Sequence, residues 1–197
     1  IDRLLGVMAQ LRNPDGGCEW DLAQSFATIA PYAIEEAYEV ADAINGGDPA
    51  AICDELGDLL LQVVFHSQIA KDDGLFGFDD VATAISDKME RRHPHIFGGA
   101  GTNDVRVQWE TIKAAERASD GPKSALDGVA LSLPALLRAQ KLQARAARVG
   151  FDWPDAEGPR AKIGEELAEV VAAPADAARA EEIGDLLFAV VNYARHL

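Results

Sequence analysis

The side chains best placed to do chemistry are carboxylates that recur in fixed pairs. Glu36 and Glu39 stand three residues apart, and Glu55 and Asp58 repeat that spacing further along the chain. An i, i+3 pair lies on one face of a helix, so two antiparallel helices would aim all four carboxylates at one point. A second set with the same internal spacing follows later in the chain: Glu166, Glu169, Glu182 and Asp185.

Charged residues on helices usually form a solvated face, which is the plainest interpretation of these acids. Two features favour a cation site instead. The acids of the first set stand among apolar residues such as Leu56 and Leu59, and residues 13–70 contain eleven acids without a single Lys or Arg. Two carboxylates about 5 Å apart repel by about 3 kcal/mol at an effective dielectric near 20. A cluster with no basic neighbour therefore calls for a metal ion.

The ligand types narrow the choice of metal. Carboxylate oxygens suit Mg²⁺, Mn²⁺ or Ca²⁺, whereas thiolate and imidazole suit Zn²⁺. Di-iron helical bundles use Glu-x-x-His pairs, and the pairs in this chain contain no histidine. Mg²⁺ commonly shares its coordination shell with substrate phosphates. We predict Mg²⁺, with Mn²⁺ as a substitute, and a phosphate ester or anhydride as substrate.

Basic residues return immediately after the first acidic set. Six of the eighteen Lys and Arg residues lie in residues 88–117, and Lys88, Arg91 and Arg92 are helical neighbours among them. Together with a metal they could clamp a polyphosphate, although pairing with acids on their own helix is an equally good interpretation. Trp109, four residues before Lys113, could stack on a base, but a helical tryptophan more often belongs to a core.

Helical periodicity dominates the elements that must position these residues. The pattern predicts helices over residues 1–12, 28–45, 49–73, 80–92, 104–118, 134–149, 159–173 and 175–197, with Thr28 and Asp48 as N-caps. Short connections between helices are typical of antiparallel neighbours in a bundle. We predict an all-α fold.

An internal repeat organises these helices. Residues 56–68 align without a gap to residues 183–195, with six of thirteen positions identical, and the upstream segments IEEAYEV and GEELAEV also match. The order of these landmarks predicts two tandem copies of one helical unit. We place the first copy at residues 1–120 and the second at residues 121–197.

Composition excludes several classes of protein. The 197 residues include 18 Lys and Arg against 33 Asp and Glu, a formal net charge of −15. This balance argues against binding to nucleic acid or to an anionic membrane surface through bulk charge. No apolar run reaches the ~18 residues of a membrane span, no secretion signal is visible, and two cysteines make no disulfide framework. We predict a cytoplasmic protein without a nucleic-acid or membrane partner.

The segment EEAYE at residues 35–39, followed by ELGD at residues 55–58, resembles the signature of the MazG-type nucleoside triphosphate pyrophosphohydrolases, in particular its tandem-repeat bacterial members. The resemblance extends to SDKMERRHPHIF, WETIK, SLPALLRAQKLQ and the second EELAE…EIGD. It covers essentially the whole chain. The ordered set is specific, whereas EExxE alone would be weak.

The resemblance implies an all-α pyrophosphohydrolase fold, homodimeric or larger assemblies, and Mg²⁺-dependent hydrolysis of nucleoside triphosphates between the α- and β-phosphates. It maps the metal ligands onto the two acidic sets. It also maps the family's basic segment onto Lys88, Arg91 and Arg92, and its late W-x-x-x-K segment onto Trp109 and Lys113. Orientation of the attacking water falls to Glu35, Glu36 or Glu39, or in the second copy to Glu165.

Which copy is active stays open at this point. In the family, the second copy is also followed by a basic helix and a W-x-x-x-K segment, which this sequence does not include. The first copy is the one whose motifs are all present, yet the C-terminal copy is often the active one in tandem members. The alternatives to an enzyme are a metal-binding regulatory or interaction module without turnover and a purely structural bundle. A pyrophosphohydrolase restricted to one related substrate is a third alternative.

Overall fold

Helices form every regular element that the computed structural model describes, over residues 1–98, 109, 112 and 124–197. This confirms the all-α prediction. The chain falls into two compact units, Ile1–Glu110 and Thr111–Leu197. The first unit contains α1 (Asp2–Leu11), α2 (Glu19–Leu22), α3 (Phe26–Gly46), α4 (Pro49–Asp72), α5 (Phe78–Arg92) and α6 (Pro94–Phe97). The second contains α8 (Ala135–Arg148), α9 (Glu157–Ala172) and α10 (Asp176–His196).

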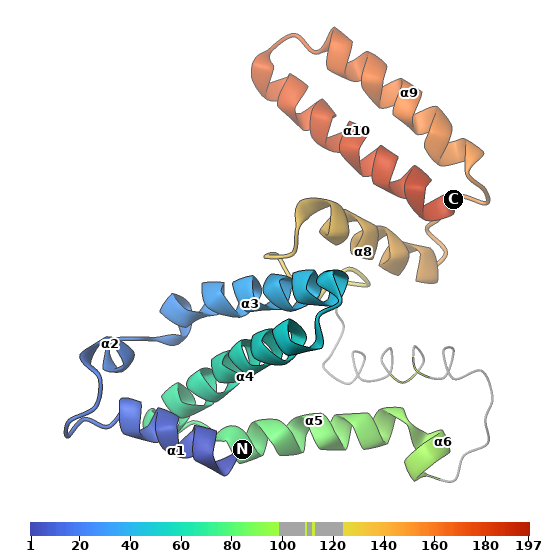
Figure 1. Ribbon diagram of the computed structural model, residues 1–197. Helices are drawn as coiled ribbons and strands as arrows, with labels where there is room; N and C mark the ends of the chain where they lie inside the picture. Colours follow the sequence, from blue (N-terminus) through green and yellow to red (C-terminus); the bar gives the residue numbers. More distant parts are fainter. Residues whose placement is uncertain (99–108, 110–111, 113–123) are drawn as a thin grey trace. The chain divides into compact units, whose positions relative to one another are not determined.

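An antiparallel pair, α3 and α4, forms the centre of the first unit (Figure 1). The turn between the two helices is short because its residues suit it. Gly47 ends α3 in the left-handed region with φ 74°, which glycine adopts without strain. Asp48 then caps α4 by accepting a hydrogen bond from the Ala50 N–H at 3.0 Å, and Pro49 occupies the first helical position. The predicted Asp48 cap is therefore confirmed.

The N-cap of α3 differs from the prediction. Ser25, not Thr28, is the capping residue, and its hydroxyl accepts from the Thr28 N–H at 3.4 Å. Thr28 returns the interaction, because its hydroxyl accepts from the Ser25 N–H at 2.8 Å. This reciprocal capping box adds a turn to the start of the helix. The prediction of Thr28 was wrong because Thr28 is the N3 residue of this capping box, whereas Ser25 is its N-cap.

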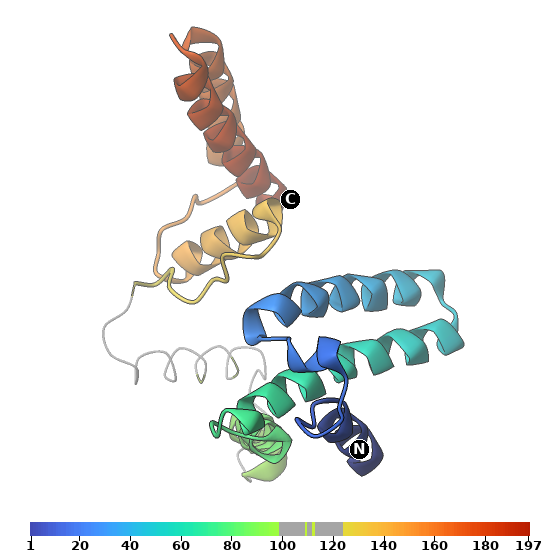
Figure 2. The same ribbon diagram turned by 90° about the vertical axis from the view of Figure 1, so that its left-hand side faces the viewer.

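The core of the first unit lies where α1 and α3 meet the second half of α4 (Figure 2). Met8, Ile29, Val64, Phe65 and Ile69 are buried there together. The first half of α4, and the part of α3 beside it, lie outside this apolar core. The carboxylate pairs of the first unit stand in that less covered part.

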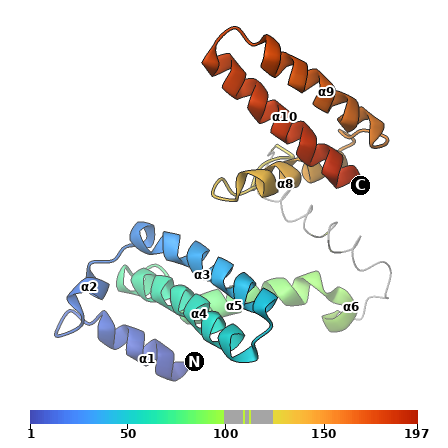
Figure 3. The same cartoon turned by 45° about the horizontal axis from the view of Figure 1, so that its top comes forward.

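A second antiparallel pair, α9 and α10, dominates the second unit, and α8 packs against α10 (Figure 3). Gln143 of α8 donates a hydrogen bond to the Phe188 carbonyl of α10 at 2.7 Å. At the C-terminal end of α10, Asp152 pairs with Arg195, and His196 Nε2 lies 3.1 Å from Asp152 Oδ1. The Arg195 hydrogen bonds lower the pKa of Asp152 to about 2. These polar contacts therefore hold the middle and the C-terminal end of α10.

Two short helices were not predicted, and one predicted helix cannot be compared. The turn-rich segment before residue 26 contains α2, and α6 follows His93 directly. Both are four residues long, which is too short for a periodic pattern to reveal. The predicted helix over residues 104–118 lies outside the described residues apart from Trp109 and Ile112. No helix among the described residues is long and apolar enough to cross a membrane.

Candidate functional site

The first acidic set comes together between α3 and α4. Glu36, Glu39 and Glu55 each offer a carboxylate oxygen, and these oxygens lie within 4.8 Å of one another. Glu36 and Glu55 are half-buried, while Glu39 is exposed. Asp58 is outside this close group, but its charge contributes to raising the pKa of Glu36. We call Glu36, Glu39, Glu55 and Asp58 the first cluster.

The charge of the first cluster is felt most strongly at Glu36. Burial is the main cause that raises the pKa of this carboxyl, followed by the hydrogen bond and the negative charge of Glu39. Gln62 opposes the rise, because its amide donates to Glu36 Oε1 at 3.2 Å. Gln62 is buried, and its own Oε1 has no hydrogen-bond partner. The spacing of the charged residues does not reveal Gln62, although this residue stands one helical turn after Asp58 on α4.

The second acidic set forms an equivalent group between α9 and α10. Oxygens of Glu166, Glu169 and Glu182 lie within 4.8 Å of one another. Glu166 is only 4% exposed, and its Oε2 has no hydrogen-bond partner. Burial and the charges of Glu166 and Glu182 raise the pKa of Glu169. We call Glu166, Glu169, Glu182 and the exposed Asp185 the second cluster, although the close group does not include Asp185.

A lysine outside the predicted site residues contacts the second cluster. Lys162 Nζ lies 2.6 Å from Glu166 Oε1 and 2.8 Å from Glu165 Oε1. Its hydrogen bonds to these two carboxylates raise the pKa of Lys162. The spacing offers a signal that could have found it, because i, i+3 and i, i+4 pairs of opposite charge face each other on a helix. Glu165, a candidate for water orientation, is therefore engaged with Lys162.

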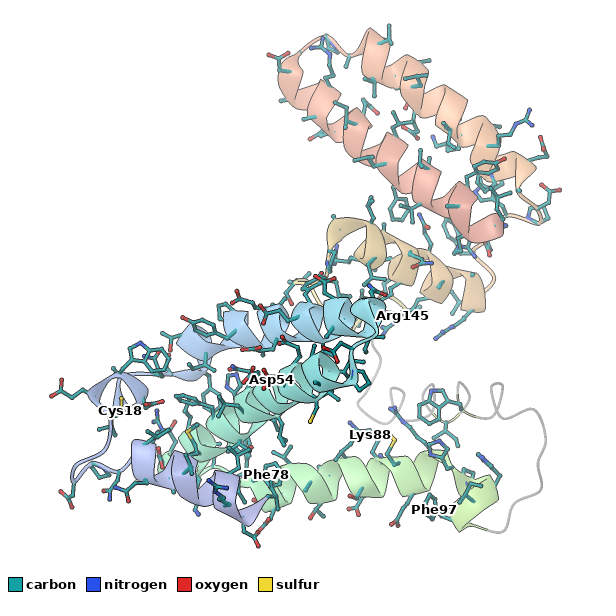
Figure 4. All side chains as sticks on the ribbon, in the orientation of Figure 1. Cys18, Asp54, Phe78, Lys88, Phe97 and Arg145 are labelled. Atoms are coloured by element: carbon teal, nitrogen blue, oxygen red, sulfur yellow. The ribbon has the colours of Figure 1, made fainter. Side chains whose placement is uncertain are left out.

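The basic residues predicted to bind substrate lie on α5, the helix that follows α4 (Figure 1). Lys88, Arg91 and Arg92 lie in the second half of this helix, on which Figure 4 labels Lys88. The Arg92 guanidinium lies over the Trp109 ring, 5.3 Å from its centroid. The structure thus brings together two of the predicted substrate-binding residues. Lys113 lies outside the described residues.

His93 joins this aromatic and cationic group. Its ring centroid lies 5.0 Å from that of Trp109 in an edge-on arrangement. Its Nδ1 is 2.6 Å from the Met89 carbonyl oxygen, which fixes the ring against α5. Trp109 is half-buried, so both interpretations of this residue, core packing and base stacking, remain compatible with its environment.

Both clusters fit a divalent metal ion. All of their ligand atoms are carboxylate oxygens, the donor type that Mg²⁺ and Mn²⁺ prefer. The oxygens lie within 4.8 Å of one another, and small side-chain movements would bring them to the 2.0–2.1 Å from one ion that is typical of Mg²⁺. The buried, unpartnered Glu166 Oε2 is an acceptor that a metal would satisfy.

Burial of the Glu36 carboxylate beside like charges should destabilise the metal-free protein. We therefore expect Glu36→Gln to raise the melting temperature of the metal-free protein at pH 7. A carboxyl whose pKa is raised binds its proton more tightly in the folded state than in the unfolded state. The contribution of Glu36 to metal-free stability is therefore greatest below pH 4.5 and is lost as pH rises through the raised pKa of this carboxyl. Thermal melts in EDTA at pH 4 and pH 7 measure this. A Glu36→Gln melting temperature below that of the wild type at pH 7 would contradict it.

Comparison with known proteins gives these clusters a family context. The family described as "MazG nucleotide pyrophosphohydrolase domain" matches residues 24–97, which include the first cluster and the basic residues of α5. A relative named nucleoside triphosphate pyrophosphohydrolase, from Escherichia coli strain K12, is 53% identical over 205 residues, covering 100% of this chain and 78% of the relative. The chain belongs to the MazG family.

Other MazG relatives extend the comparison. The nucleoside triphosphate pyrophosphohydrolase/pyrophosphatase MazG of Thermotoga maritima is 44% identical over 197 residues, covering 100% of this chain and 76% of the relative. The nucleoside triphosphate pyrophosphohydrolase of Mycobacterium tuberculosis is 37% identical over 154 residues, or 76% of this chain and 46% of the relative. The resemblance seen in the sequence motifs is thereby confirmed.

Proposed function

We propose that this MazG protein hydrolyses nucleoside triphosphates between the α- and β-phosphates, giving a nucleoside monophosphate and pyrophosphate. The observation that carries the proposal is the convergence of Glu36, Glu39 and Glu55 between two helices, in a chain 53% identical to a nucleoside triphosphate pyrophosphohydrolase. The clusters hold Mg²⁺ or Mn²⁺. In each pair of helices the ligands are the four carboxylates of the cluster.

A bound Mg²⁺ would neutralise triphosphate charge and make a coordinated water more acidic. The chain's own residues do the rest. Lys88, Arg91 and Arg92 neutralise phosphate oxygens as negative charge moves toward the leaving pyrophosphate. Glu35, on the turn that carries Glu36, is exposed and accepts a hydrogen bond from the attacking water. Glu36 and Glu39 are the alternatives for orienting this water.

Pyrophosphate release from a panel of nucleoside triphosphates, with and without Mg²⁺, tests the reaction. Hydrolysis in H₂¹⁸O tests the bond that breaks, because attack at the α-phosphorus puts the label in the nucleoside monophosphate. We expect labelled monophosphate and unlabelled pyrophosphate. Binding of nucleotide without pyrophosphate release would identify a regulatory module instead. Label in pyrophosphate would place the attack on the β-phosphorus.

Metal binding predicts a thermal shift that a structural bundle would lack. A ligand that binds only the folded state stabilises it by about 2.7 kcal/mol at one hundred times its Kd. We expect saturating MgCl₂ to raise the melting temperature of the chain by several degrees above NaCl at matched ionic strength. Equal melting temperatures in the two salts would favour solvated acidic faces over metal sites.

The proposal includes a homodimer, supported by apolar side chains on the outside of α4. Leu56, Leu60 and Val63 follow i, i+4, i+7 spacing and are 49%, 40% and 38% exposed. Ile183, Leu187 and Val190 repeat that stripe on α10. Stripes with this spacing pack against other helices in bundles. A second copy covers them in a symmetric assembly.

Light scattering after size exclusion measures the assembly. A dimer has twice the 21.0 kDa mass of one chain. The Leu60→Glu variant should shift the mass toward that of a single chain, because it places a charge in the proposed interface. A wild-type protein that elutes with the mass of one chain would contradict the dimer.

A further inference from the structure

Different donors contact the equivalent glutamates, Glu36 and Glu166, of the two clusters. In the first cluster the donor is the neutral amide of Gln62, 3.2 Å from Glu36 Oε1. In the second it is the ammonium of Lys162, 2.6 Å from Glu166 Oε1. The first donor leaves the negative charge of its cluster intact, whereas the second cancels one unit of it.

Alignment of the two copies shows that neither contains the other's donor. When Glu36 is matched with Glu166, the position of Lys162 is occupied by Tyr32 in the first copy. When residues 56–68 are matched with residues 183–195, Ala189 stands where the first copy has Gln62. Tyr32 is 42% exposed on α3, one turn before Glu36. The two copies therefore differ in the partner of this glutamate, which is a neutral amide in the first copy and a cation in the second.

We propose that Lys162 is a counter-cation within the second cluster and weakens its affinity for a divalent metal, so that the first cluster fills at lower metal concentration. The inference rests on the metal sites of the proposed function. Its geometric basis is the difference between the two carboxylate oxygens of Glu166. Oε1 pairs with Lys162, whereas the buried Oε2 has no hydrogen-bond partner. Oε2 is thus available to a metal, next to a fixed positive charge.

Electrostatics sets the direction and the size of this effect. Lys162 is half-buried and also pairs with Glu165, so its charge is held beside the cluster in two contacts. A unit charge about 6 Å from a divalent ion changes the affinity about tenfold even in the dielectric of water. The lysine therefore separates two otherwise similar sites by about one order of magnitude in Kd.

A reciprocal exchange in the full chain tests the inference, with Mn²⁺ binding followed by electron paramagnetic resonance of the free ion. Glu39→Gln with Glu55→Gln disables the first cluster, and Glu169→Gln with Glu182→Gln disables the second. In the first background, Lys162→Tyr should tighten Mn²⁺ binding about tenfold. In the second background, Tyr32→Lys should weaken it by a similar factor, because lysine at this exposed position can reach Glu36.

Two control variants separate charge from other effects. Lys162→Arg keeps the charge and should keep the weak affinity. Arg160→Tyr removes an equal charge from the same helix, where Arg160 pairs with Glu157, and should leave Mn²⁺ binding unchanged. Mn²⁺ affinities that do not respond to Lys162→Tyr and Tyr32→Lys would overturn the counter-cation role and leave the metal sites standing. Absence of Mn²⁺ binding in both backgrounds, Lys162→Tyr included, would overturn the metal sites themselves.

Discussion

Simultaneous Glu39→Gln and Glu169→Gln should abolish Mg²⁺-dependent pyrophosphate release, with a loss on the order of a hundredfold or more. One residue in each cluster is changed, so the result does not depend on which copy is active. Glutamine has the shape of glutamate but lacks the charge, and charge stabilisation at a transferring phosphoryl group is a large part of catalysis. Initial rates of pyrophosphate release at saturating Mg²⁺ measure the loss.

A matched control guards against a general effect of charge. Asp42→Asn with Glu181→Gln also removes one acid each from α3 and α10, at exposed positions outside both close groups. This control should retain activity within a few fold, and both double variants should keep the helical circular dichroism of the wild type. Full activity of the Glu39→Gln, Glu169→Gln variant would exclude the carboxylate mechanism. Equal losses in the two variants would attribute the effect to overall charge.

The carboxylate clusters could be predicted from sequence because helical geometry converts spacing into proximity. The i, i+3 pairs fix one face of each helix, and the short turn at Gly47 and Asp48 makes the helices antiparallel neighbours. Glu36, Glu39 and Glu55 then have to meet. The position of the aspartate in each set, Asp58 or Asp185, does not follow from spacing alone. Whether its carboxylate reaches the other three depends on how the helices cross and on side-chain rotamers.

The partners of the clusters could not be predicted with the same rules. Gln62 contacts Glu36 from 26 positions away, so its role depends on the packing of α4 against α3. Lys162 is local to its partners, and its spacing predicts ion pairs with Glu165 and Glu166. Such pairs are common on solvated helices, so the spacing alone does not assign Lys162 to a metal site. The contact of Arg92 with Trp109 joins residues far apart in the sequence, so it depends on tertiary packing that the spacing of residues does not encode.

Phe65→Ala should destabilise the first unit more than any surface substitution. It should thereby loosen α4, the helix that carries Glu55. Phe65 is 5% exposed in the core, and its ring meets Trp20 edge-on with centroids 6.4 Å apart. The Arg12 guanidinium lies 5.7 Å from the same ring centroid. Truncation of a buried Phe to Ala typically costs about 3–5 kcal/mol, through lost apolar burial and a residual cavity.

Phe97→Ala provides the matched comparison, because it makes the same chemical change in the same unit at a side chain that is 62% exposed (Figure 4). Urea titrations should show a large fall in the midpoint for Phe65→Ala and a change of less than about 0.5 kcal/mol for Phe97→Ala. Since α4 carries both Phe65 and Glu55, Phe65→Ala should also lose Mg²⁺-dependent activity at a lower temperature than the wild type. Equal midpoints for the two variants would mean that this core does not hold α4 in place, and the cluster would then need another source of rigidity.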